Sequence, residues 1–198
     1  MTFLQLVRRH CRWRDMPVAL AFFMLAIVLF AFAAGPDAQF TARFGDAALW
    51  TAALLATVLP VATMFAGERT NGTLDQLRMS GMAMETVAVA RLLSHWLAFT
   101  PTLLFGVLLG GVLLDEPSGA NLLIFLGASP GLAATALVAA SLTERARGGA
   151  ALAALLLPPL ALPILIFGTG GSIRLVLASS LFLATVAPFA AAAALRLR

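Results

Sequence analysis

The chain has 198 residues, of which 61% are hydrophobic and only 11% are charged, and its mean hydropathy is +0.97. A soluble domain of this length cannot bury so much apolar surface, so the composition predicts an all-α membrane protein. The isoelectric point of about 11.3 would also suit a nucleic-acid-binding protein. The arginines, however, are scattered between apolar runs and form no single basic surface, which argues against nucleic acid as a partner.

Residues 1–15 predict an amphipathic helix that lies in the membrane interface and does not cross the membrane. Basic residues fall on one side of this helix and apolar residues on the other: Arg8, Arg9 and Arg12 against Phe3, Leu6, Val7 and Cys11. A cleaved targeting peptide is the alternative interpretation. We disfavour it because the segment lacks the ordered apolar region and small-residue cleavage site of a signal peptide.

Six apolar runs follow, and each is long enough to cross a bilayer as a helix that rises about 1.5 Å per residue. They cover approximately Met16–Ala34, Ala47–Ala66, Leu92–Leu114, Asn121–Leu142, Ala150–Gly168 and Leu175–Leu195. We therefore expect residues 1–198 to form a single transmembrane domain with six spans.

Proline and glycine modify these predicted spans. The Ser-Pro-Gly run at residues 129–131 could divide the fourth span into two half-helices, and three prolines between residues 158 and 163 predict a kink in the fifth. Pairs of glycines four apart, Gly106/Gly110 and Gly127/Gly131, permit close approach between neighbouring helices. We interpret both pairs as packing features.

The distribution of arginine predicts the orientation of the chain, because the cytoplasmic loops of membrane proteins carry an excess of basic residues. With six spans, both termini lie on one side of the membrane. That side would hold Arg8, Arg9, Arg12, Arg14, Arg69, Arg78, Arg91, Arg145, Arg147, Arg196 and Arg198, and the other side Arg43 and Arg174. We therefore expect both termini, and the segment between the second and third spans, to face the cytoplasm.

The segment Glu68–Gly81 is the mid-chain stretch in which several charged residues crowd together. An Asn-Gly turn pair opens it. Thr73 followed by Gln76 then matches a helix cap in which hydroxyl and amide each satisfy a backbone N–H. Gly81 suits the position just after a helix. The segment therefore predicts a turn and one short helix.

This short helix presents two different faces. Leu74 and Leu77 lie three residues apart on one face, and Asp75 and Arg78 share another. Such a helix could lie on the lipid headgroups, or its leucines could dock into a groove on a soluble partner. The spacing alone leaves both interpretations open.

The energy source for any transport is predicted to lie outside this chain. The predicted spans contain no Asp, Glu, Lys or Arg away from their ends, which argues against a carrier driven by protons or ions. The chain has no lysine, so it lacks the phosphate loop of a Walker-type ATPase. Neither histidine has a buried carboxylate within sequence reach, so we expect no hydrolase triad. These features predict a non-catalytic membrane subunit.

Few residues could ligate a metal or cofactor. The single cysteine, Cys11, excludes an intrachain disulfide and a multi-cysteine metal site. His95, next to Trp96, could ligate haem iron or could place its ring in water at the membrane interface. We favour the interface for His95, and more strongly for His10. We therefore expect the chain itself to bind no metal and no cofactor.

Several motifs, taken in order, resemble a known family along almost the whole chain. They are Gly35–Gln39 with Arg43 and Trp50, then Glu68–Arg69, Gly72–Leu77, Val87–Trp96, Arg147–Gly149, Leu156–Phe167, Pro188–Ala190 and Ala193–Arg196. Their order and spacing resemble the haem exporter protein B (CcmB) family, the membrane subunit of the cytochrome c maturation ABC complex. The family leads us to expect lysine at position 91, where this chain has arginine.

The resemblance implies a bacterial inner-membrane protein that is similar in fold to ABC-2-type exporters and is paired with a separate ATPase subunit. It also implies that the segment 68–81 is a cytoplasmic coupling helix, which favours docking over lipid. The residues expected at the ATPase contact are Glu68, Arg69, Gly72, Leu74, Asp75, Leu77 and Arg78.

The function implied by the resemblance is haem handling for c-type cytochrome assembly. The implied partners are a haem-handling membrane subunit and a periplasmic haem chaperone, with a homodimer as a further possibility. ATP hydrolysis could drive haem export or release of the loaded chaperone. Two other functions stay open: an assembly scaffold through which no substrate passes, and an ABC-2-type permease for a polysaccharide or drug.

Overall fold

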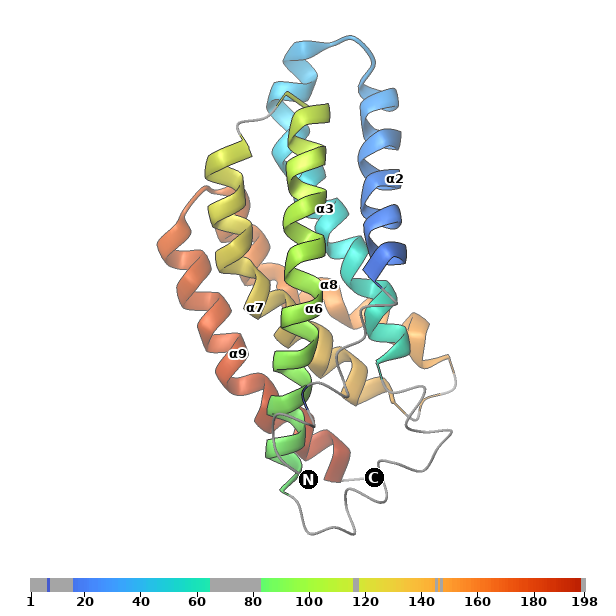
Figure 1. Ribbon diagram of the computed structural model, residues 1–198, viewed down its shortest axis with the longest axis vertical. Helices are drawn as coiled ribbons and strands as arrows, with labels where there is room; N and C mark the ends of the chain where they lie inside the picture. The colour runs from blue at the N-terminus through green and yellow to red at the C-terminus, as the bar shows by residue number, and fades with distance from the viewer. Residues whose placement is uncertain are drawn as a thin grey trace.

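The computed structural model describes Val7 and residues 16–64, 83–115, 118–144, 146 and 148–196. Over these residues the chain forms a bundle of six long helices (Figure 1): α2 (Met16–Ala34), α3 (Ala38–Thr63), α6 (Met84–Leu113), α7 (Ser118–Thr143), α8 (Gly149–Thr169) and α9 (Ile173–Arg196). Each of the six is long and apolar enough to cross a membrane. The prediction of an all-α membrane protein with six spans is confirmed. The predicted interfacial helix at residues 1–15 lies outside the described residues, except for Val7.

Two helices begin well before the predicted spans. Helix α3 starts at Ala38 because Asp37 caps it: the Asp37 carboxylate accepts hydrogen bonds from the backbone N–H groups of Gln39 and Phe40, both at 3.0 Å. Helix α6 starts at Met84, before the expected start at Leu92. In both cases the predicted start was placed after the last charged residue, but a helix can continue past a charge at the membrane boundary.

Proline does not divide the helices that it was expected to interrupt. Helix α7 runs unbroken through Pro130, so the alternative of two half-helices is wrong. Helix α8 runs through Pro158, Pro159 and Pro163, and the kink expected there stays a prediction. The lost backbone hydrogen bonds are tolerated because side chains can supply other partners. At Pro130 the carbonyl that loses its donor is that of Leu126, and it accepts a hydrogen bond from the Ser129 hydroxyl at 2.8 Å. The N–H of Gly131 also donates to the Ser180 hydroxyl of α9 at 2.8 Å.

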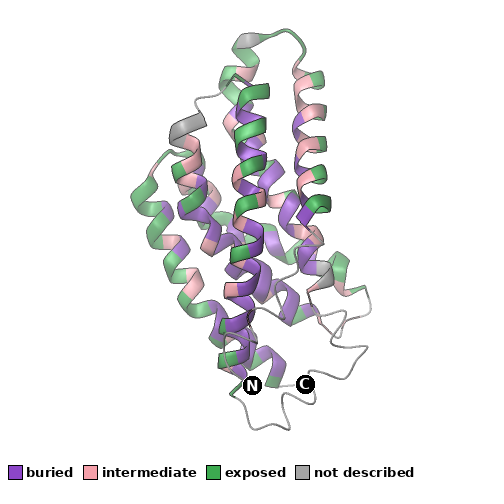
Figure 2. Cartoon of the chain, in the orientation of Figure 1, coloured by how far each residue is buried: buried purple, intermediate pink, exposed green. Residues whose placement is uncertain are grey.

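Helix α7 is the centre of the bundle. Of its span, 61% is buried inside the chain, against 22% for α2 and 22% for α8. Figure 2 shows the complementary pattern, with buried residues facing inward and many exposed residues on the outer faces of α2 and α9. Large apolar side chains such as Phe32 on α2 and Phe182 on α9 point outward, as expected where lipid is the solvent.

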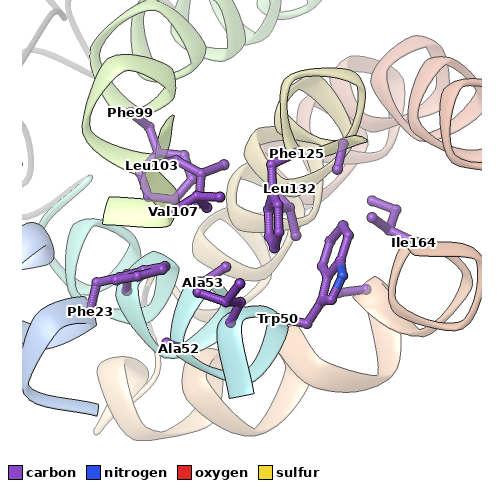
Figure 3. Packing of buried hydrophobic residues seen from close by; sticks show 14 of the residues in the cluster. Phe23, Trp50, Ala52, Ala53, Phe99, Leu103, Val107, Phe125, Leu132 and Ile164 are labelled. Atoms are coloured by element: carbon purple, nitrogen blue, oxygen red, sulfur yellow. The ribbon is translucent and has the colours of Figure 1, made fainter. Parts of the chain in front are cut away.

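The main hydrophobic core joins α2, α3, α6, α7, α8 and α9 around Trp50. The Trp50 side chain is 2% exposed. Its ring stacks on that of Phe125, with 4.0 Å between the centroids. Figure 3 shows Trp50 reaching from α3 between Phe125 of α7 and Ile164 of α8. A single indole therefore fills the space between three helices.

Glycine allows the helices around this core to approach closely. A Cβ atom added at Gly110 would meet Leu49 at 2.7 Å, and one at Gly131 would meet the Ser180 backbone at 2.8 Å. One added at Gly106 would touch the Phe23 ring at 3.0 Å. The glycine pairs thus serve helix packing, which confirms that interpretation of their spacing.

We expect Gly168→Ala to lower the free energy of unfolding by about 1–3 kcal/mol, the usual cost of overpacking a filled core. The new methyl group would lie inside van der Waals distance of the Trp50 ring, which cannot move away from Phe125 and Ile164. Thermal unfolding of the purified chain in detergent measures this loss.

The matched control is Gly127→Ala, whose Cβ meets the flexible end of the Leu177 side chain at 3.1 Å. This substitution should be close to neutral, because the leucine can adjust and alanine favours a helix by about 1 kcal/mol over glycine. Equal effects at the two positions would contradict the assigned role of Trp50.

Candidate functional site

The predicted ATPase-contact residues Glu68, Arg69, Gly72, Leu74, Asp75, Leu77 and Arg78 all lie outside the described residues, so their role stays a prediction. The structure does define the two helices that flank them. Helix α3 ends at Thr63 with Met64 as its C-cap, and α6 begins after the cap residue Ala83. The segment 65–82 therefore joins the second span-capable helix to the third, as predicted.

The first three turns of α6, Met84–Ser94, are called the α6 base below. They pack against other helices at this end of the bundle. Its apolar residues Met84, Val87 and Ala90 are buried against Ala192 near the end of α9. Figure 1 shows these ends of α6 and α9 side by side. The α6 base thus begins directly after the segment 65–82 and is held by a helix far along the chain.

The N-terminal segment also contacts the α6 base. Val7 packs on its apolar cluster, and the carbonyl oxygen of Val7 accepts a hydrogen bond from the Ser94 hydroxyl at 2.9 Å. Val7 was assigned to the apolar side of an interfacial helix. In the structure it lies against protein, so at this residue helices α6 and α9 take the place expected for lipid.

A salt bridge joins the outer surface of the α6 base to α9. The guanidinium of Arg196 and the carboxylate of Glu85 are 2.6 Å apart. Both side chains are partly exposed, at 56% and 31% of their surface, so water screens the pair and it contributes at most about 1 kcal/mol. The salt bridge shows that the start of α6 lies beside the end of α9.

Arg91 is a buried charged residue inside α6, although the sequence predicted that the third span begins after it. It was assigned to the cytoplasmic side and placed just before the third span. It lies two turns inside α6 and is only 2% exposed. A buried charge is costly and is usually kept for a function, so Arg91 belongs to the candidate site.

His95, one turn further along α6, is also buried. Its side chain is 8% exposed, and its ring stacks on that of Phe99 with 5.5 Å between centroids. Within the described part of the chain, its Nε2 atom has no hydrogen-bond partner. The expectation of a ring with its polar side in water is therefore wrong: tertiary packing of α6 places the imidazole among apolar neighbours.

The polar residues of this region contact other helices. Among the described residues, no group of three or more His, Cys, Asp or Glu side chains could hold a metal ion. The polar groups of α6 instead bind other helices: the Trp96 indole N–H donates to the Ser129 hydroxyl of α7 at 2.9 Å. Ser94 and Trp96 thus connect α6 with Val7 and with α7.

A signal for the α6 base was present in the sequence. Met84, Val87 and Ala90, together with Arg91, recur at intervals of three and four residues, which is the period of one helix face. The arginine was counted as a mark of the membrane boundary, and this hid the helix that leads up to it. The burial of His95 had no comparable signal, because it depends on which helices surround it.

Comparison with known proteins gives one consistent result. The family model described as "CcmB protein" matches residues 1–198 of this chain. The chain is similar to several proteins named Heme exporter protein B, including the following three. The protein from Bradyrhizobium diazoefficiens is 35% identical over 90% of this chain and 88% of its own length. The one from Rhodobacter capsulatus is 36% identical over 90% and 89%. That from Haemophilus influenzae is 30% identical over 100% and 98%.

Proposed function

The chain belongs to the CcmB family, and on that basis we propose that it is the membrane subunit of a haem-exporting ABC transporter. In this proposal a separate ATPase subunit hydrolyses ATP. The energy drives haem export, or release of a haem-loaded periplasmic chaperone, during c-type cytochrome assembly. The observation that carries the proposal is the match over all 198 residues to a family whose members are named as haem exporters.

The architecture supports a division of labour between this chain and its partners. Its six span-capable helices and lack of lysine fit a subunit that provides the membrane part of a transporter and no ATP site. The segment 65–82, which joins α3 to α6, is the natural contact for an ATPase subunit. A haem-handling membrane subunit and the chaperone complete the proposed complex, with a second copy of this chain as a further partner.

The experiment that tests the proposal is reconstitution of the chain in vesicles with its ATPase subunit, the haem-handling subunit and the chaperone. We expect ATP to cause haem to cross the membrane or the loaded chaperone to leave the complex. Vesicles that lack only this chain are the control and should do neither. If polysaccharide or drug crosses instead, the alternative of an ABC-2-type permease for another substrate is correct.

We propose the bacterial inner membrane as the location, with both termini in the cytoplasm. The arginine distribution supports this orientation. A reporter inserted at Asn71, or fused to either terminus, is expected to be cytoplasmic, and a reporter at Asp37 or Asp115 to be periplasmic. Paired alkaline phosphatase and fluorescent protein fusions measure the two outcomes. A periplasmic signal from the Asn71 fusion would contradict the orientation and the ATPase contact together.

We further propose that a partner, and not this chain, holds haem tightly. Haem iron is usually bound by His, Met, Cys or Tyr. This chain has two histidines, one cysteine, no tyrosine and seven methionines, and methionine in a membrane span is an ordinary packing residue. We expect the His10→Ala/His95→Ala variant, purified with its partners, to keep its full haem content as measured by absorbance. Loss of haem from an otherwise intact complex would instead make His95, whose Nε2 is buried, a ligand.

A further inference from the structure

Two consecutive prolines in α8, Pro158 and Pro159, leave one backbone carbonyl without its usual donors. In an α-helix a carbonyl accepts from the N–H four residues later, and in the tighter 3₁₀ form from the N–H three residues later. For Leu155 both of these positions are proline, which has no N–H. The prolines inside the other described helices stand singly, so each carbonyl that they affect still has an N–H three residues later.

Helix α7 meets the same difficulty at Pro130 and resolves it inside the bundle. The Ser129 hydroxyl donates to the carbonyl of Leu126 at 2.8 Å, in place of the N–H that Pro130 lacks. Among the described residues, no side chain donates to the carbonyl of Leu155 in this way. Helix α7 thus completes its backbone hydrogen bonds within the chain, and α8 does not.

The surface around the Leu155 carbonyl is open. Leu155 is 73% exposed, and Pro158, Pro159 and Leu162 on the same helix face are exposed as well. Leu155 lies six residues, or about 9 Å, beyond the start of α8 at Gly149, which is inside the hydrocarbon layer of a bilayer. Lipid chains cannot donate hydrogen bonds, so a carbonyl left open to them there is costly. A group other than lipid is needed to cover it.

Neither water nor a second copy of this chain suits this position. All side chains of α8 from Leu152 to Ile166 are apolar, so this face is neither the wall of a water-filled cavity nor a source of side-chain donors for an α8 of another copy. The exposed hydroxyls in the middle of the other described spans, Thr51 and Thr185, already donate to carbonyls of their own helices, both at 2.8 Å. The missing donor therefore belongs to a different chain.

We propose that the outer face of α8 from Leu152 to Ile166 is the docking surface for a transmembrane helix of a different subunit, which carries a side-chain amide, hydroxyl or indole that donates to the carbonyl of Leu155. Apolar side chains supply the contact area, and the carbonyl fixes the register of the two helices. This inference rests on the proposed function in one respect, because it assumes that the haem-handling membrane subunit binds this chain. It adds the surface at which that subunit binds and the kind of residue that it presents.

The first test finds which molecule covers this face. A photoreactive benzophenone amino acid replaces Leu155 in the complete complex, purified with its haem-handling membrane subunit. We expect a cross-link to a membrane helix of that subunit, located by mass spectrometry close to a Ser, Thr, Asn, Gln or Trp residue. The same amino acid at Phe32 of α2, which is 82% exposed, is the control for a lipid-facing position and should not capture that subunit.

The second test returns the missing donor to α8. Pro159→Ala places an N–H four residues after Leu155, so its carbonyl no longer needs a partner. We expect the affinity for the haem-handling subunit, titrated in nanodiscs, to fall about 3- to 20-fold, the equivalent of one hydrogen bond between membrane helices. Pro163→Ala is the matched control, because Pro163 is also exposed on α8 but lies too far along the helix to supply Leu155. It should change the affinity by less than about twofold.

Three results would overturn the inference. The cross-link from Leu155 could form with lipid alone, or with a second copy of this chain alone, or Pro159→Ala could fold and bind the subunit with unchanged affinity. If the wild-type chain binds no other membrane subunit, the proposed function fails as well. A wild-type complex that stays together while Leu155 cross-links to lipid alone contradicts only the inference about α8.

Discussion

Replacing Leu74 and Leu77 together with glutamate is expected to abolish recovery of the ATPase subunit with this chain. If both leucines fill a groove on the ATPase, each glutamate would bury a charge without a partner. That costs about 3 kcal/mol or more per site, so the combined loss of affinity should exceed about a thousandfold. Affinity purification of the tagged chain, followed by quantification of the ATPase subunit, measures the effect. The yield of c-type cytochromes should fall with it.

The matched control for this experiment is Leu74→Met/Leu77→Met, which keeps apolar side chains of similar volume and should retain the ATPase subunit. Both leucines lie in the polar segment between α3 and α6, so the glutamate variant should still insert and fold. Undiminished recovery of the ATPase with the glutamate variant would show that this segment is not the docking element and would favour its lying on lipid.

Trp50→Ala is expected to lower the free energy of unfolding by about 3–5 kcal/mol, the range for removing a large aromatic side chain from a packed core. The indole is 2% exposed and stacks on Phe125, and its removal would leave a space bordered by three helices. Lipid chains cannot fill an enclosed space between helices, so the lost contacts would not be replaced. A domain with about 5–15 kcal/mol of stability loses a large share of it.

Phe182→Ala is the control for this substitution, because Phe182 is an aromatic residue on α9 that is 65% exposed. Its removal should change stability by less than about 1 kcal/mol. Thermal unfolding in detergent, monitored by circular dichroism, compares the two variants. Similar losses at both positions would mean that the core around Trp50 is less tightly packed than its contacts indicate.

Much of the fold could be predicted from the sequence because lipid imposes one dominant requirement, a helix of about 20 apolar residues. That requirement placed α2 at its observed bounds, Met16–Ala34. It did not place the starts of α3 and α6, because a helix start depends on local caps such as Asp37 and on packing partners. The start expected at Leu92 left Arg91 outside the third span, although it lies inside α6.

Some residues of the candidate site could be predicted from the sequence, and others could be found only in the structure. The coupling residues from Glu68 to Arg78 were predicted from local patterns and from a family resemblance that the comparisons confirm, while their role as a contact stays a prediction. Arg91 and His95 emerged only from the structure. Their burial follows from the packing of α6 against helices that are distant in the sequence, and no local pattern contains that information.

The central position of α7 has a consequence for biosynthesis. Helix α7 precedes α8 and α9 in the chain, although these two helices pack against much of its surface. Until α9 arrives, the amide of Gly131 lacks the Ser180 hydroxyl that satisfies it, and an unsatisfied amide in hydrocarbon costs several kcal/mol. The bundle is therefore incomplete at its centre until its last helix has packed against α7.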